Sequence, residues 1–186
     1  MTSEKEIIEM LFSRNDKAIN KLEQSFGRLL FKLSYNIVGN EESAKECVND
    51  TYLGVWNAIP PSRPNNLMAY VCKIARNTSL KYYWKENADK RQGNLASQIE
   101  EIEECVADYR SVEGEIEEKE LTCIIEDFLD SLSTENRVIF MRRYWFAESY
   151  EEISERTTLS KKNISVRLSR IRRELRLYLE KRGVIL

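Results

Sequence analysis

Apolar residues recur every three or four positions along most of the chain, which is the spacing that places side chains on one face of an α-helix. In residues 4–38 this pattern predicts two helices, with a break near Asn15 and an end at Gly39. A third helix is predicted over residues 41–59. Its apolar face consists of Ala44, Val48, Tyr52, Val55 and Trp56. The opposite face is polar, which on pattern alone indicates a solvated surface.

All three prolines fall within residues 60–66, where proline cannot continue a helix because it lacks the backbone N–H. A stiff loop is predicted here, and it either presents polar side chains outward or simply connects two helices. The next helix is predicted over residues 67–85. Its apolar face consists of Leu67, Val71, Ile74, Ala75, Thr78 and Tyr82, and its other face carries Lys73, Arg76, Asn77, Lys81, Trp84 and Lys85. Cations interleaved with an aromatic residue suit phosphates and unpaired bases, whereas Tyr83 and Trp84 equally suit closure of the helix end against a core.

Helical periodicity is lost between residues 86 and 118, where the chain is polar and acidic. Residues 98–120 carry ten acids and two bases, and residues 156–182 carry ten bases and two acids, so a net charge of only −2 conceals two strongly charged segments. We expect an all-α protein of two small helical domains, residues 1–88 and 120–186, joined by an acidic flexible linker over residues 89–119. The acids of this linker, including Glu100 and Glu101, are expected to screen the basic segment from stray nucleic acid.

Residues 150–179 have the pattern of a helix-turn-helix, with a short helix, a tight turn and a long helix that begins near Lys161. The apolar side of the long helix consists of Ile164, Leu168, Ile171, Leu175 and Tyr178. Asn163, Val166, Arg167 and Arg170 fall on the other side, where a recognition helix contacts the DNA major groove. A calmodulin target or a membrane-surface helix is disfavoured, because the apolar stripe is narrow and a short helix and turn precede it.

The composition argues against an enzyme. The chain has no histidine, and its four cysteines, Cys47, Cys72, Cys105 and Cys123, are widely separated. Neither a metal site, a cofactor-binding loop nor a nucleophile motif is recognisable, so we expect no cofactor. The chain also has no apolar run of about 20 residues and no signal-peptide pattern, so we expect a cytoplasmic protein without membrane insertion.

Three motifs in series carry a resemblance to a known family. Residues 44–56 read AKECVNDTYLGVW, residues 70–77 read YVCKIARN, and residues 150–154 and 164–172 read YEEIS and ISVRLSRIR. In this order and at this separation they resemble the conserved helices of the extracytoplasmic-function (ECF) group of bacterial RNA polymerase sigma factors. Members of this group have two helical domains, called regions 2 and 4, and direct the polymerase to promoters.

The resemblance implies a role for each surface. A polymerase-binding face would consist of Glu46, Asn49, Asp50 and Leu53. Contacts with the minus-ten promoter element would come from Arg63, Asn65, Asn66, Lys73, Arg76, Asn77 and Lys81. Contacts with the minus-thirty-five element would come from Lys161, Lys162, Asn163, Ser165, Val166, Arg167, Ser169, Arg170 and Arg173. The implied partners are core RNA polymerase, promoter DNA and an anti-sigma factor.

The sequence departs from the family pattern in the turn, where Thr158 stands at a position usually filled by glycine. Because a β-branched residue is costly at positive φ, the turn either has a different geometry or carries strain. The main alternative function is a free-standing helix-turn-helix regulator, which would not need the Asp50 face or the proline-rich loop. A sigma-sequestering interaction protein is a third possibility, which the basic final helix disfavours.

Overall fold

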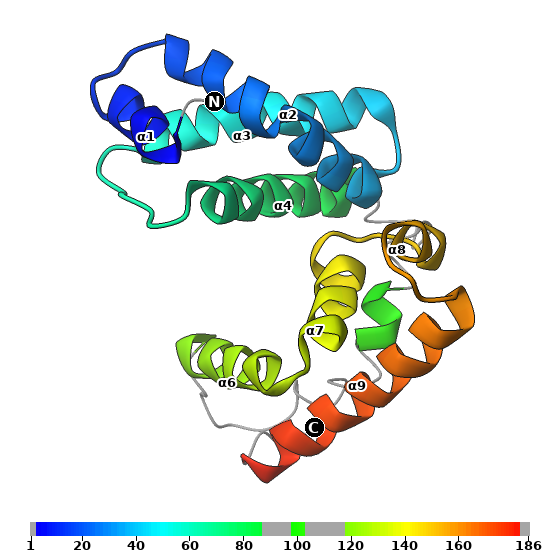
Figure 1. The fold of residues 1–186 in the computed structure, drawn as a ribbon. Coiled ribbons are helices and arrows are strands. Elements are labelled where there is room, and N and C mark those ends of the chain that lie inside the picture. The colour runs from blue at the N-terminus through cyan, green and yellow to red at the C-terminus, as the bar shows by residue number, and fades with distance from the viewer. Residues whose placement is uncertain (1–2, 87–97, 103–117, 183–186) are drawn as a thin grey trace. The chain divides into compact units, whose positions relative to one another are not determined.

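A computed structural model of the chain describes residues 3–86, 98–102 and 118–182, and all regular structure in these ranges is helical (Figure 1). The chain divides into two compact units, Met1–Leu95 and Ala96–Leu186. The predicted all-α class with two helical domains is therefore confirmed. None of the helices in the described ranges is both long enough and apolar enough to cross a membrane.

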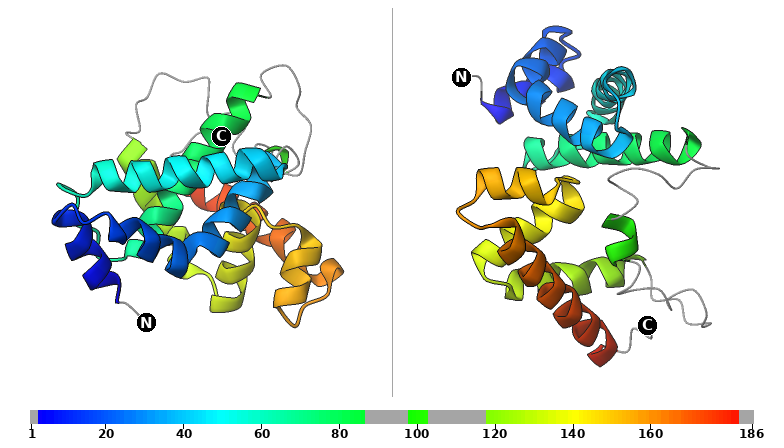
Figure 2. Two further views of the ribbon diagram at one scale, coloured as in Figure 1. Left: turned by 90° about the horizontal axis from the view of Figure 1, so that it is seen from above. Right: turned by 90° about the vertical axis from the view of Figure 1, so that its right-hand side faces the viewer.

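The first unit consists of α1 (Glu4–Phe12), α2 (Lys17–Val38), α3 (Glu41–Ala58) and α4 (Leu67–Glu86). Helices α2, α3 and α4 pack against one another, and α1 packs against α2 and α4 (Figure 2). The core between them is formed by fully buried aliphatic side chains such as Leu30, Val55 and Val71. Burial of aliphatic side chains is the main stabilising contribution in a bundle of this size.

Local sequence signals set the ends of these helices. The predicted break lies between Phe12 and Lys17, where the Asn15 carboxamide oxygen accepts a hydrogen bond from the Lys17 amide at 3.1 Å. Helix α2 ends at Gly39, which adopts φ 80°, a left-handed conformation that costs glycine little. The Asn40 side chain then caps α3 by accepting a hydrogen bond from the Ser43 amide at 2.7 Å.

The second unit contains α6 (Glu118–Ser131), α7 (Thr134–Phe140), the π-helix η1 (Met141–Trp145), α8 (Tyr150–Arg156) and α9 (Lys161–Lys181). The Ser133 hydroxyl caps α7 by accepting a hydrogen bond from the Asn136 amide. One hydrophobic core joins these helices. Its buried members are Ile124, Phe128, Leu132, Ile139, Phe140, Ile153, Ile164, Leu168, Ile171, Leu175 and Leu179. On α9, Leu179 rather than the predicted Tyr178 completes the buried stripe, and Tyr178 is half-buried beside the Phe128 ring.

Residues 98–102 form a short helical segment that belongs to the second unit, although they lie inside the predicted linker. Ile102 packs against the hydrophobic core of this unit, and Gln98 is buried. The remainder of the predicted linker, except its last two residues, lies outside the described residues. The structure thus assigns one piece of the acidic segment to the helix-turn-helix unit.

Candidate nucleic-acid interface

The long helix α9 separates its apolar and polar side chains cleanly. Ile164, Leu168, Ile171 and Leu175 are buried. Eight of the nine residues predicted to contact the minus-thirty-five element are exposed, namely Lys161, Lys162, Asn163, Ser165, Val166, Ser169, Arg170 and Arg173. Since α8 precedes α9 and packs against it, the helix-turn-helix arrangement leaves the amino-terminal half of this face accessible, as major-groove recognition requires.

Two cations of this face are engaged by neighbouring helices. Arg167 is half-buried and forms an ion pair with Glu135, in the first turn of α7. The Lys161 ammonium donates a hydrogen bond to the Glu151 carboxylate of α8 at 2.6 Å, which lowers the pKa of Glu151. These acids therefore engage two basic side chains of the recognition face.

The turn between α8 and α9 is held by side-chain hydroxyl groups instead of a left-handed glycine. The Thr157 hydroxyl donates to the Ile153 carbonyl at 2.8 Å, and the Ser154 hydroxyl donates to the Leu159 carbonyl at 2.8 Å. Among the described non-glycine residues only Arg14 and Ala147 have positive φ, so Thr158 does not. The turn differs in geometry from the glycine type, and Thr158 carries no left-handed strain.

The structure brings together most, but not all, of the residues on α4 that were predicted to contact the minus-ten element. Lys73, Asn77, Lys81 and Trp84 are exposed along one side of the helix, whereas Arg76 is half-buried and burial lowers its pKa. The buried stripe is rotated relative to the prediction, because Cys72, Ser79 and Tyr83 are buried while Ile74, Thr78 and Tyr82 are only half-buried. A buried hydrogen bond from the Ser79 hydroxyl to the Ser34 hydroxyl, at 3.0 Å, accompanies this rotation.

The loop of residues 60–66 supplies exposed polar side chains, but two of them also have structural roles. Arg63 forms an ion pair with Glu9, and its guanidinium lies 4.7 Å from the centre of the Phe12 ring. The Asn66 carboxamide oxygen accepts a hydrogen bond from the Ala69 amide at 2.7 Å and so caps α4. Asn65 is exposed. The loop is thereby fixed to α1 and α4.

The predicted polymerase-binding residues form one exposed face of α3. Glu46, Asn49, Asp50 and Leu53 are all exposed, and the Leu53 side chain is 58% exposed. The Glu46 carboxylate accepts a hydrogen bond from the Tyr82 hydroxyl of α4 at 3.1 Å. This face therefore lies beside the carboxyl-terminal part of α4.

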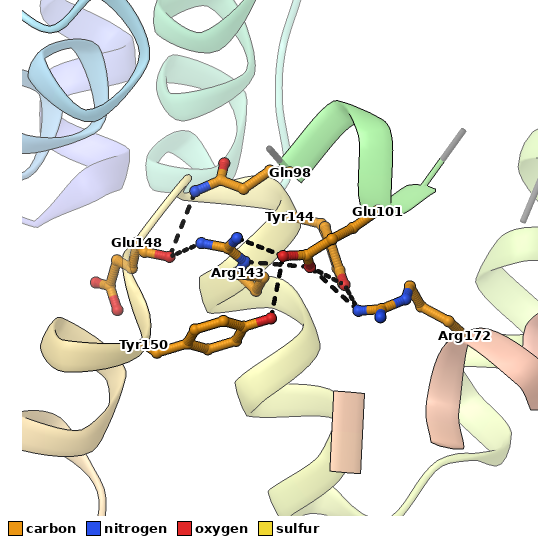
Figure 3. A network of polar contacts seen from close by, with 7 residues as sticks. All are labelled: Gln98, Glu101, Arg143, Tyr144, Glu148, Tyr150 and Arg172. Carbon is orange, nitrogen blue, oxygen red and sulfur yellow. Dashed lines mark hydrogen bonds and ion pairs between the residues drawn. The ribbon is translucent and has the colours of Figure 1, made fainter. Parts of the chain in front are cut away.

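A polar cluster that sequence reasoning did not identify lies in the second unit (Figure 3). The Glu101 carboxylate accepts hydrogen bonds from Arg143 at 2.6 Å, from the hydroxyl groups of Tyr144 and Tyr150 at 2.9 and 3.0 Å, and from Arg172 at 3.1 Å. We call these four donors the Glu101 site. Arg143 is only 5% exposed and also donates to the Glu148 carbonyl at 3.2 Å.

Charge and burial act on this cluster in opposite directions. Burial alone would raise the pKa of Glu101, but the hydrogen bonds and charge of Arg143 and the bonds from Tyr144 and Tyr150 outweigh it, so the pKa lies below its ordinary value. Burial, together with the charge of Glu101, raises the pKa of Tyr150. Glu101 is therefore ionised at neutral pH and both tyrosines are protonated. The available signal in the sequence was the pair Arg142-Arg143 inside an otherwise apolar stretch.

A second buried acid lies next to this cluster. The Glu148 carboxylate is almost fully buried and accepts hydrogen bonds from Arg142 at 3.0 and 3.1 Å, with Arg156 at 3.6 Å. Both bonds to Arg142 come from the same Nη1 atom, and hydrogen bonds between charged groups are stronger than those between neutral groups. Here the pair joins η1 to the segment that leads into α8.

Two comparisons with protein families match the two units separately. The family model for Sigma-70 region 2 matches residues 22–88, and the model for Sigma-70, region 4 matches residues 124–175. Together they cover more than half of the chain, in the order expected for a sigma factor. The chain belongs to the ECF group of sigma factors. No curated protein sequence matches it.

As a sigma factor the protein binds core RNA polymerase and promoter DNA and directs transcription initiation. Sigma factor families are not enzymes. A free-standing regulator is disfavoured, because it has no use for a region 2 unit. The region 2 match contains α3 and α4, and the region 4 match contains α8 and most of α9.

Proposed function

We propose that promoter recognition is divided between the two units of this sigma factor. In this proposal residues 1–88 form the domain that binds core polymerase and the minus-ten element, and residues 120–186 form the domain that binds the minus-thirty-five element. Residues 89–119 connect them, with residues 98–102 attached to the second unit. The main supporting observation is that α9 presents an exposed basic face directly opposite its buried stripe.

In the first unit, Glu46, Asn49, Asp50 and Leu53 bind the polymerase through the exposed face of α3. The loop side chains Arg63, Asn65 and Asn66 take up an unpaired base of the minus-ten element. Lys73, Asn77 and Lys81 then contact the strand, since cations beside an exposed aromatic such as Trp84 favour phosphate binding and stacking. Arg76 contributes from the half-buried edge of this surface.

In the second unit, the amino-terminal half of α9 enters the major groove of the minus-thirty-five duplex. Asn163, Val166, Arg167 and Arg170 lie where base edges are contacted, because they occupy the exposed side of the first two and a half turns. The remaining polar residues contact phosphates. These are Lys161, Lys162, Ser165, Ser169 and Arg173.

We further propose that the protein acts in the cytoplasm, catalyses no reaction itself and is held inactive by an anti-sigma factor. The anti-sigma factor in this proposal is supported by the resemblance to the ECF group.

Pull-down with core polymerase, followed by run-off transcription on genomic fragments, tests the proposal. We expect the protein to bind the polymerase and to direct initiation from a distinct set of fragments. Asp50→Lys should lose polymerase binding, and Arg170→Ala should lose selectivity among fragments. DNA binding that is unaffected by polymerase, with no initiation, would contradict the proposal.

A further inference from the structure

Residues 98–102 are attached to the second unit at three points. Glu101 occupies the site formed by Arg143, Tyr144, Tyr150 and Arg172, and these donors come from η1, α8 and α9 (Figure 3). Gln98 is 2% exposed and donates a hydrogen bond to the Glu148 carbonyl at 3.5 Å. Ile102 packs against the hydrophobic core. The segment is therefore held by the part-buried ionic contacts of Glu101, one hydrogen bond from Gln98 and the apolar contact of Ile102.

The buried members of the hydrophobic core of the second unit all lie outside this segment, which adds only the partly buried Ile102. They come from α6, α7, α8 and α9, with Leu132 directly after α6. The Glu101 site thus receives a carboxylate from a part of the chain that the helix-turn-helix does not need for its own core. Such a contact can form or open while α7, α8 and α9 stay packed.

We propose that the contact between Glu101 and its four donors acts as a latch. When the contact is formed (closed), it shortens the stretch of chain that connects the two DNA-binding units, and it thereby restricts the promoter spacing that the protein accepts. This inference rests on the proposed division of promoter recognition between the units. The site itself is a carboxylate-binding site whose occupant is Glu101.

The maximum length of an extended chain shows how far apart the two units can lie with the latch closed and with it open. With the latch closed, twelve peptide units separate Glu86, at the end of α4, from Gln98, and they can extend to at most about 40 Å. With the latch open, the next fixed element is α6, and the 32 peptide units from Glu86 to Glu118 can extend to about 105 Å. Each base pair adds about 3.4 Å between two promoter elements, so the closed latch narrows the range of spacings that both units can bind together.

The test compares Glu101→Gln with Glu100→Gln in the full-length protein. Glu100 is the exposed neighbouring acid and provides a matched change of charge. Donor and acceptor dyes are placed on the exposed Cys123 of α6 and on Gln24→Cys of α2, in a Cys105→Ser background. We expect Glu101→Gln to lower the energy-transfer efficiency and broaden its distribution, and Glu100→Gln to leave both unchanged.

The second readout is transcription with core polymerase from templates in which the spacing of the two elements is varied by up to four base pairs. Glu101→Gln should raise initiation at the non-optimal spacings at least threefold relative to the optimal one. A Gly/Ser insertion after Gln92 lengthens the connecting chain and keeps the Glu101 site intact. It should likewise raise initiation at the non-optimal spacings. This result would exclude misfolding of the Glu101 variant as the cause.

Unchanged energy transfer in Glu101→Gln would overturn the latch. Altered energy transfer with a spacing profile identical to that of the unmodified protein would overturn its role in promoter spacing. Absence of transcription from every template by the unmodified protein would instead contradict the proposed function, while the energy-transfer measurement still decides whether the latch exists.

Discussion

Arg167 of α9 is held by an ion pair with Glu135 of α7, although it belongs to the face of α9 that we propose to contact DNA. Both side chains are partly exposed, and exposed ion pairs contribute about 0.2–1 kcal/mol. DNA binding by Arg167 has to displace this interaction. Glu135→Gln should therefore raise affinity for the minus-thirty-five duplex by about 1.5- to 5-fold.

Fluorescence anisotropy with a short duplex measures this change. Glu126→Gln is the control, because Glu126 is an exposed acid on α6 and its replacement alters the net charge equally. An equal gain in both variants would mean that the general electrostatic field, and not release of Arg167, is responsible.

Arg167→Ala and Arg170→Ala test which side chains read base edges. Each should cost about 1–3 kcal/mol on the preferred duplex and much less on duplexes altered at the contacted base pair. Binding titrations over a set of single-base variants measure the difference. A loss of equal size on every duplex, with a smaller salt dependence, would indicate phosphate contact only.

Asp50→Lys should abolish binding to core polymerase with little effect on folding, because Asp50 is exposed in the middle of the α3 face. Exposed substitutions usually change stability by less than about 0.5 kcal/mol. Glu126→Lys, on the second unit, provides the same change of charge away from this face. Pull-down and thermal unfolding of both variants separate a lost contact from a lost fold.

The Glu101 site predicts a defined pH dependence. The folded pKa of Glu101 lies below its ordinary value of 4.5, so the site stabilises the second unit above that value and the stabilisation is lost as pH falls through the lowered folded pKa. At pH 7, Glu101→Gln should reduce the free energy of unfolding by about 1.5–3 kcal/mol, the range for hydrogen bonds to charged groups.

Fluorescence of Trp145 reports on this unit alone in a W56F/W84F background, because the other two tryptophans lie in the first unit. The difference in the free energy of unfolding between Glu101→Gln and the unmodified protein should become smaller as the pH falls. A difference that stays constant down to pH 3 would show that the charge of Glu101 does not stabilise the unit.

Leu168→Ala tests the core of the helix-turn-helix. Leu168 is fully buried, and leucine-to-alanine changes in such positions cost about 2–5 kcal/mol. Its neighbour Ser169 is exposed, so Ser169→Ala should stay within about 0.5 kcal/mol. Urea unfolding monitored by Trp145 compares the two variants.

The buried and exposed faces of a helix could be predicted from the sequence where the helix has a single stripe of apolar residues. The opposite faces of α9 were predicted correctly apart from Tyr178 and Leu179, because a single narrow apolar stripe leaves little choice of orientation. The exposed face of α3 was also recognised, although this helix packs against both α2 and α4 and buries Ser43, Cys47 and Thr51 outside the predicted stripe. On α4 the prediction was rotated, because this helix packs against both α2 and α3 and buries polar side chains such as Ser79.

The Glu101 site could not be predicted from periodicity. Its members are separated by up to 71 positions, and Glu101 stands in an acidic run that reads as solvated chain. Only the fold brings four donors around one carboxylate. The geometry of the turn at Thr158 was also undecided by sequence, since the hydroxyl groups of Thr157 and Ser154 hold the turn in place of the usual glycine.

The hydrogen bond from Tyr82 to Glu46 joins the helix assigned to the minus-ten strand to the helix assigned to the polymerase. If Glu46 contacts the polymerase as we propose, the polymerase side chain that takes its carboxylate competes with the Tyr82 hydroxyl. Docking would then free a hydrogen-bond donor on α4, the helix that we propose to contact the minus-ten strand. A single shared carboxylate can in this way make strand capture conditional on assembly.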